Sequence, residues 1–171
     1  MVKKRIMMHF PKLQLHRGYW KSGVRENTLQ AFIAAKRLGV EMVELDVQLS
    51  KEKVPVVFHD LTLKRLFHIE DKVTQTSLED LKTLSVPLLD QVLVSNEVPK
   101  NINIELKVKN LFCYNLVKQV MKSVNKYPKK RILISSFNPI CLFWTRLLSP
   151  RLPRALIVGD RSLVLSALQY L

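Results

Sequence analysis

The stretch Glu41–Val47, which reads EMVELDV, decides the fold and the chemistry that we predict for this chain. Its apolar and β-branched residues are typical of a buried strand, yet it carries two carboxylates, Glu44 and Asp46. Residues two apart in a strand point to the same face, so both carboxylates aim at one place. Buried like charges need a positive group between them. A divalent cation with oxygen ligands, Mg²⁺ or Ca²⁺, is one solution, and a wet face where each carboxylate pairs with a lysine is the alternative.

The composition narrows the class of protein. A chain of 171 residues is long enough to bury a core, and a hydrophobic content of 47% excludes a disordered protein. We therefore expect one domain over residues 1–171. No run of about 18 apolar residues is present, so no transmembrane helix is expected. The net charge of +14 favours anionic surroundings such as phosphate substrates, lipid headgroups or nucleic acid. A solvated basic surface without a specific partner is the alternative.

The two cysteines, Cys113 and Cys141, form neither a disulfide framework nor a metal-binding pattern. We expect both to be reduced and buried, which fits a cytoplasmic protein. The basic start Lys3–Arg5 is typical of a signal peptide, but the apolar run after it stops at His9 and Pro11. That run is too short for the apolar region of a signal peptide.

Segments of strand type alternate with segments of helix type along the rest of the chain. Helices are predicted over residues 27–38, 76–84, 87–93, 115–126, 139–148 and 162–169. Strands are predicted near Leu15, Val43, Val56, Ile104, Leu133 and Ile157. Strands separated by helices indicate an α/β fold with a parallel sheet.

Polar residues gather where these strands end. They are His16, Asp46, His59, Glu105, Lys107, Ser135 and Ser136. In a (β/α) barrel or a doubly wound sheet the carboxyl ends of the strands form one face, and chemistry takes place there. This coincidence favours a functional site over a set of unrelated surface residues.

The residues at this face fit hydrolysis of a phosphodiester. Carboxylates are predicted to hold one divalent cation, a forked guanidinium and an ammonium to bind the phosphoryl group, and two imidazoles to move protons. The residues are Glu44, Asp46 and Glu105 for the cation, Arg17 and Lys107 for the phosphoryl group, and His16 and His59 for proton transfer. The alternatives remain that Lys107 neutralises Glu105 with no metal present, and that Arg17 pairs with a surface carboxylate.

The same residues carry a resemblance to a known family. The motifs are HRG at 16–18, ENT at 26–28, AF at 31–32, Gly39, ELDV at 44–47, PVVFHD at 55–60, IELK at 104–107 and SSF at 135–137. In this order and spacing they resemble the glycerophosphodiester phosphodiesterase family over residues 13–158. The joint pattern is far more specific than any one of the motifs.

The resemblance implies a TIM-type (β/α)₈ barrel of the phospholipase-C-like phosphodiesterase kind. It also implies metal-dependent hydrolysis of glycerophosphodiesters to glycerol 3-phosphate and an alcohol. His16 and His59 would be the general acid–base pair, Glu44, Asp46 and Glu105 the metal ligands, and Arg17 with Lys107 the phosphate contacts. A glycerol hydroxyl would attack first, and water would open the resulting cyclic phosphate.

The sequence departs from the family after its sixth predicted strand. The last two strand–helix units have no counterpart before Leu171, and such a barrel usually needs about 250 residues. We therefore expect a barrel that is incomplete at its C-terminus. Either the chain is a truncated or frameshifted product, or something else, such as a second copy of the chain, closes the open edge.

Two further functions stay open. One is a basic barrel remnant that binds anionic lipid or polyanion without catalysis, and the other is a related enzyme that acts on lysophospholipids. A specific nucleic acid partner is not expected, whereas peripheral contact with an anionic membrane and a homo-oligomer remain open.

Overall fold

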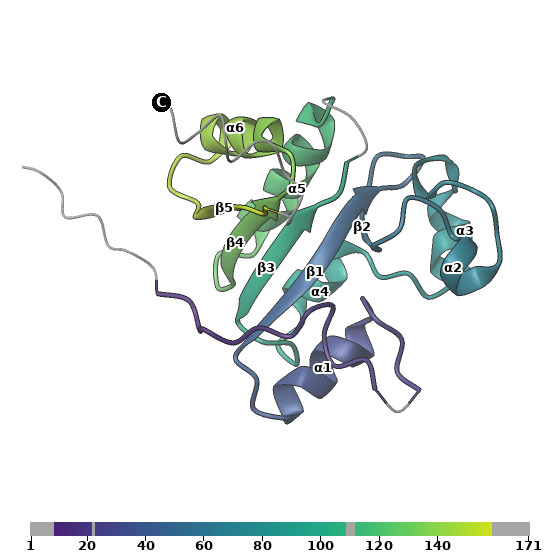
Figure 1. Ribbon diagram of the computed structural model, residues 1–171, viewed down its shortest axis with the longest axis horizontal. Helices are drawn as coiled ribbons and strands as arrows, with labels where there is room; N and C mark the ends of the chain where they lie inside the picture. Colours follow the sequence, from purple (N-terminus) through teal and green to yellow (C-terminus); the bar gives the residue numbers. More distant parts are fainter. Residues whose placement is uncertain (1–8, 22, 109–111, 159–171) are drawn as a thin grey trace, which may run out of the picture.

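The computed structural model describes residues 9–21, 23–108 and 112–158 (Figure 1). Within them the chain forms one sheet in the order β2-β1-β3-β4-β5. The strands are β1 Met42–Leu49, β2 Pro55–Val57, β3 Asn101–Leu106, β4 Arg131–Ser136 and β5 Arg154–Leu156. The helices are α1 Leu29–Arg37, α2 Lys64–Phe67, α3 Leu78–Thr83, α4 Leu89–Val94, α5 Tyr114–Lys126 and α6 Pro139–Leu148, with a 3₁₀ turn, η1, at Val73–Gln75.

Strand β1 is buried along its whole length, and its two faces differ in chemistry. Val43, Leu45 and Val47 join the main core together with apolar residues of α1, α4 and α5. Glu44 and Asp46, which alternate with them, are buried on the opposite face. The predicted strand with two carboxylates on one face is therefore confirmed.

Parallel pairing sets these carboxylates against those of the neighbouring strand. Strands β1 and β3 pair in parallel with Asp46 opposite Glu105, and β3 and β4 pair in parallel with Glu105 opposite Ser135. Two carboxylates directly opposite each other repel unless a cation compensates them. The register thus concentrates negative charge at the carboxyl end of the sheet.

The pairing of β2 differs from the prediction of a parallel sheet. Strand β2 runs antiparallel to β1, with Val47 opposite Val57. The reason is the connection: residues 50–54 form only a tight turn, with Ser50 N–H donating to Val54 O at 2.9 Å, and a short turn joins antiparallel strands. The sheet is therefore mixed, with the other pairs parallel.

Two predicted strand boundaries also differ from the structure, and one predicted helix is not tested by it. The strand near Leu15 is an isolated parallel bridge from Leu15 to Val43, without further pairing in the described residues. The strand near Ile157 ends at Leu156. The helix predicted over residues 162–169 lies outside the described residues.

A second, smaller core lies under the segment that follows β2. It contains Val56, Phe58, Leu63, Val73, Leu81 and Val86. Figure 1 shows α2 and α3 beside the β2 edge of the sheet, on the side away from β5. The small core fixes this segment against the strand that leads into His59.

Helix α1 begins as the sequence predicts, because Thr28 caps it by accepting a hydrogen bond from Ala31 N–H at 3.2 Å. Cys113 and Cys141 are buried and free, as predicted. Among the described residues, no helix has the length and apolarity needed to cross a bilayer.

Candidate active site

Three buried carboxylates meet at the carboxyl ends of β1 and β3. Glu44, Asp46 and Glu105 each place one oxygen so that the three oxygens lie within 4.8 Å of one another. Asp46 is fully buried, and the other two are no more than 5% exposed. Such a cluster of oxygen ligands could hold one divalent cation.

Glu44 is the carboxylate of the cluster that pairs with no lysine or arginine side chain of the described residues. Its Oε1 atom is buried and accepts no hydrogen bond from the described residues, and its Oε2 accepts one from Arg17 N–H at 3.0 Å. Burial, with the neighbouring charge of Asp46, raises the pKa of Glu44 to about 8. A bound cation would stabilise the charged form of Glu44 and lower its pKa again, as expected for a metal ligand.

Lys107 compensates the other two carboxylates. Its Nζ lies 2.6 Å from Glu105 Oε1 and 3.2 Å from Asp46 Oδ1. Burial alone would lower the pKa of Lys107, but these two partners raise it. The lysine therefore neutralises Glu105, as one alternative reading of the sequence held, yet it leaves Glu44 without a cation.

Arg17 and Asn27 hold Asp46 from the other side. Arg17 Nε lies 3.3 Å from Asp46 Oδ2, and Arg17 Nη1 donates to Glu26 Oε1 at 3.0 Å. Asn27 donates from Nδ2 to Asp46 Oδ2 at 2.8 Å and accepts from Asp46 N–H at 3.3 Å. These bonds fix the orientation of the Asp46 carboxylate.

The turn that carries His16 and Arg17 requires a glycine. Gly18 has φ +80°, and a Cβ there would lie 2.9 Å from backbone and side-chain atoms of Ala31 and Phe32. The chain passes so closely over α1 that only glycine fits. Arg17 itself has φ 60°, a strained conformation for a residue with a side chain.

His16 lies at the open side of the cluster. Its Nε2 is 3.9 Å from Glu44 Oε2, and its side chain is 63% exposed. Partial desolvation, followed by the charge of Arg17, lowers the pKa of His16, and His59 is close enough to contribute to that shift. The two predicted histidines thus share one electrostatic environment with Asp46 and Glu105.

His59 is oriented by a carboxylate next to it in the chain. Asp60 Oδ1 lies 2.6 Å from His59 Nδ1, and Arg65 pairs with Asp60 and with Glu26. Burial alone would raise the pKa of Asp60, but the bonds to Arg65 and His59 hold it below its ordinary value. The arrangement leaves His59 Nε2 as the ring nitrogen for a reacting group.

Backbone bonds bring this histidine to the carboxylates. Phe58 N–H donates to Asp46 O at 2.9 Å, and Gln48 Nε2 donates to the carbonyls of Phe58, His59 and Asp60 at 2.9, 3.2 and 2.7 Å. The antiparallel return of β2, together with Gln48, therefore places His59 beside the site.

Every residue that the sequence analysis selected lies at this end of the sheet. Four supporting residues were not given a role there: Glu26, Asn27, Asp60 and Arg65. Because Thr28 caps α1, the side-chain amide of Asn27 is free to bond to Asp46. In the sequence, the position of Asp60 directly after His59 is the feature that points to its role as a partner of the histidine.

Comparison with known proteins agrees with this geometry. The model of the glycerophosphoryl diester phosphodiesterase family matches residues 16–170. A glycerophosphodiester phosphodiesterase of Caldanaerobacter subterraneus is 32% identical over 157 residues, covering 83% of this chain and 64% of the relative. The chain spans 64% to 67% of the length of this relative and of two further curated relatives that are 31% and 34% identical to it.

Solved structures show the same fold. A phosphodiesterase of Oleispira antarctica, in complex with its product sn-glycerol-3-phosphate, has a TM-score of 0.79 and 25% identity, covering 94% of this chain and 71% of that one. The glycerophosphodiester phosphodiesterase of Thermotoga maritima has a TM-score of 0.72 and 31% identity, covering 90% of this chain and 65% of that one.

Proposed function

Because the chain belongs to the glycerophosphoryl diester phosphodiesterase family, we propose that it hydrolyses glycerophosphodiesters to glycerol 3-phosphate and an alcohol. The observation that carries the proposal is the meeting of Glu44, Asp46 and Glu105 beside His16, His59 and Arg17. The product held by the Oleispira antarctica phosphodiesterase is the one expected here.

The three carboxylates would hold one divalent cation, Mg²⁺ or Ca²⁺. The partnerless Oε1 of Glu44 supports this assignment, because Lys107 already serves the other two carboxylates. When bound, the cation would polarise the phosphoryl oxygen and stabilise the charge that develops in the transition state.

The positive side chains of the site would bind and orient the phosphodiester. Arg17 lies at the cluster with its guanidinium fixed between Asp46 and Glu26, and Lys107 adds a second positive charge. A fixed guanidinium fork matches two oxygens of a phosphoryl group. These groups need little reorganisation as negative charge grows on the phosphorus oxygens.

The histidines would move the protons. His59, backed by Asp60, takes the proton from the attacking hydroxyl of the glycerol half as the new P–O bond forms. His16 gives a proton to the leaving alkoxide as the old P–O bond breaks. Water then opens the cyclic phosphate with the two histidines in exchanged roles, so that protons balance over the cycle.

Release of glycerol 3-phosphate from glycerophosphodiesters tests this proposal. We expect release that stops with chelator, returns with Mg²⁺ or Ca²⁺, and is lost in His16→Ala and His59→Ala. His9→Ala is a matched control, because His9 is exposed and its hydrogen bond to Arg131 within the described residues uses the backbone carbonyl, which the substitution keeps. Turnover that survives both active-site histidine changes would overturn the mechanism.

The remaining expectations stay predictions. They are the single domain over residues 1–171, the cytoplasmic location, the contact with an anionic membrane and the homo-oligomer.

A further inference from the structure

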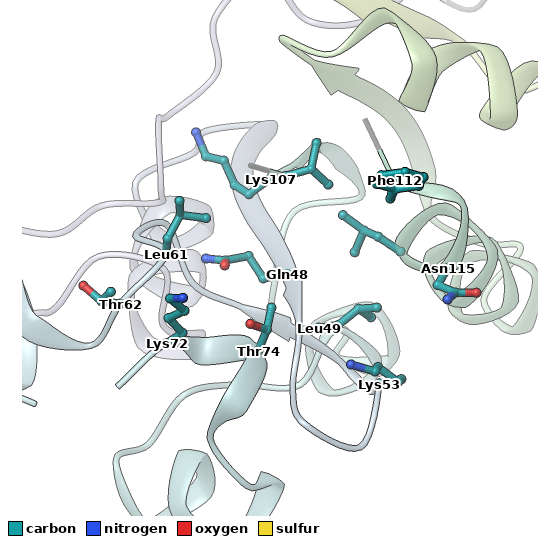
Figure 2. A pocket seen from close by; sticks show the side chains of 12 residues that line it. Gln48, Leu49, Lys53, Leu61, Thr62, Lys72, Thr74, Lys107, Phe112 and Asn115 are labelled. Atoms are coloured by element: carbon teal, nitrogen blue, oxygen red, sulfur yellow. The ribbon is translucent and has the colours of Figure 1, made fainter. Parts of the chain in front are cut away.

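A pocket of about 480 Å³ opens beside the carboxylate cluster. It lies between the end of β1, the segment around η1 and the start of α5, and Figure 2 shows its side chains. The lining residues are Gln48, Leu49, Lys53, Leu61, Thr62, Lys72, Thr74, Lys107, Val108, Phe112, Asn115 and Leu116. Its volume is that of a small-molecule site, roughly 300–1,000 Å³.

Two residues join this pocket to the cluster. Gln48 follows Asp46 by two positions on the same face of β1, which is a step of about 7 Å along the strand. Lys107 lines the pocket while its Nζ lies 3.2 Å from Asp46 Oδ1. A molecule whose phosphoryl group sits at the cluster can therefore extend one of its halves into the pocket.

The charge of the pocket is positive. Lys53, Lys72 and Lys107 line it, and no carboxylate is among its lining residues in the described part of the chain. Lys53 and Lys72 are exposed, and neither is in an ion pair among the described residues. In Figure 2, Lys107 and Lys53 lie on opposite sides of Gln48.

The pocket is poorly suited to a cation. Quaternary ammonium groups are recognised by aromatic faces, and Phe112 is the one aromatic residue among those that line the pocket in the described chain. Lysines repel a cation and attract phosphate groups, while Thr62, Thr74 and Asn115 offer polar side chains suited to hydroxyl groups.

We propose that this pocket, the alcohol pocket, binds the alcohol half of the diester and selects a phosphorylated polyol over a cationic alcohol such as choline. The inference rests on the proposed function, since it names the substrate class of the same site. The glycerol half, which is small and common to all substrates, stays at the carboxylate cluster. Lys53 and Lys72 determine the preference for the anionic alcohol.

The experiment compares two diesters that share the glycerol phosphate half, glycerophosphoinositol 4-phosphate and glycerophosphocholine. In the wild type we expect kcat/KM to be roughly tenfold higher for the phosphorylated inositol, because two exposed lysines attract its phosphate group weakly through water. The preference should shrink as salt is added. In the double variant Lys53→Glu/Lys72→Glu it should vanish or reverse.

A control outside the pocket carries the charge change of one of these two substitutions. Lys51 belongs to the same turn as Lys53 and is exposed, but it does not line the pocket. Lys51→Glu should keep the wild-type preference. Equal use of both diesters, preference for choline, or a double variant that behaves like Lys51→Glu would overturn the inference.

Binding separates this inference from the proposed function. The His59→Ala variant, titrated with each diester in a calorimeter, should bind the phosphorylated inositol diester more tightly. If no diester is hydrolysed by the wild type, the proposed function fails, and the order of these affinities still decides for or against the alcohol pocket.

Discussion

The carboxylate cluster and the alcohol pocket adjoin each other but differ in sign and in rigidity. Glu44, Asp46 and Glu105 are buried on paired strands. Hydrogen bonds orient Glu44 and Asp46, and an ion pair with Lys107 holds Glu105. Lys53 and Lys72 are exposed and unpaired within the described chain. From this difference we expect the buried carboxylates to determine the reaction and the exposed lysines to determine the choice of substrate. A substitution of a buried carboxylate should abolish activity, whereas a substitution of an exposed lysine should change the substrate preference.

The largest effect is expected in the cluster. Asp46→Asn keeps the shape of the side chain but removes a charge that Arg17 and Lys107 face, so metal affinity and turnover should fall together. We expect a loss of about 10³-fold or more in kcat/KM, measured as glycerol 3-phosphate release. A loss no larger than that of an alcohol-pocket variant would erase the proposed distinction between the two regions.

The next effect concerns proton transfer. His59→Ala removes a proton carrier and should lower kcat by about 10²- to 10⁴-fold, with little change in metal affinity. Calorimetric titration with Mg²⁺ or Ca²⁺ checks the second part, because His59 contacts Asp60 rather than the cluster. If metal binding disappeared as well, His59 would belong to the cation site and not to proton transfer.

A smaller effect is expected at Arg65, which contacts the partners of His59 and Arg17 rather than these residues themselves. Its side chain joins Asp60 to Glu26 and thereby steadies both His59 and Arg17. Arg65→Lys cannot bridge two carboxylates with a fork, so kcat should fall by roughly tenfold while KM changes little. Lys64→Arg, at the neighbouring exposed position, should leave both values unchanged and serves as the control.

A further effect concerns stability rather than turnover, and it depends on pH. The pKa of Glu44 is raised to about 8 in the folded chain, so the folded state binds a proton that the unfolded state releases near pH 4.5. Between these values the metal-free protein should lose up to about 1.4 kcal/mol of unfolding free energy for each pH unit of increase. Glu44→Gln should flatten this slope in urea titrations, and an unchanged slope would place the cause elsewhere.

The sequence predicted most of the site because its residues lie at strand ends that alternation identifies. The spacing of Glu44 and Asp46 and the alternation around Glu105 predict three carboxylates on one face of the sheet. Buried carboxylates need a metal cation or lysines beside them. Among the described residues Lys107 pairs with two of the carboxylates, and Glu44 Oε1 has no hydrogen-bond partner.

What the sequence did not predict depends on contacts between distant segments. A tight turn returns β2 antiparallel, a fact set by connection length and not by the apolar pattern of Pro55–Val57. Arg65 reaches Glu26 across 39 positions of the chain, and Asn27 reaches Asp46 across 19. Local periodicity carries no information on such pairs, so the supporting network was found only in the fold.

Diffraction from a crystal soaked with Mn²⁺ and recorded for anomalous scattering tests the central claim most directly. The account predicts one strong peak bonded to oxygens of Glu44, Asp46 and Glu105, at about 2.0–2.6 Å as for hard cations with oxygen ligands. No peak at this position, or a peak bound only by residues outside these strands, would contradict it.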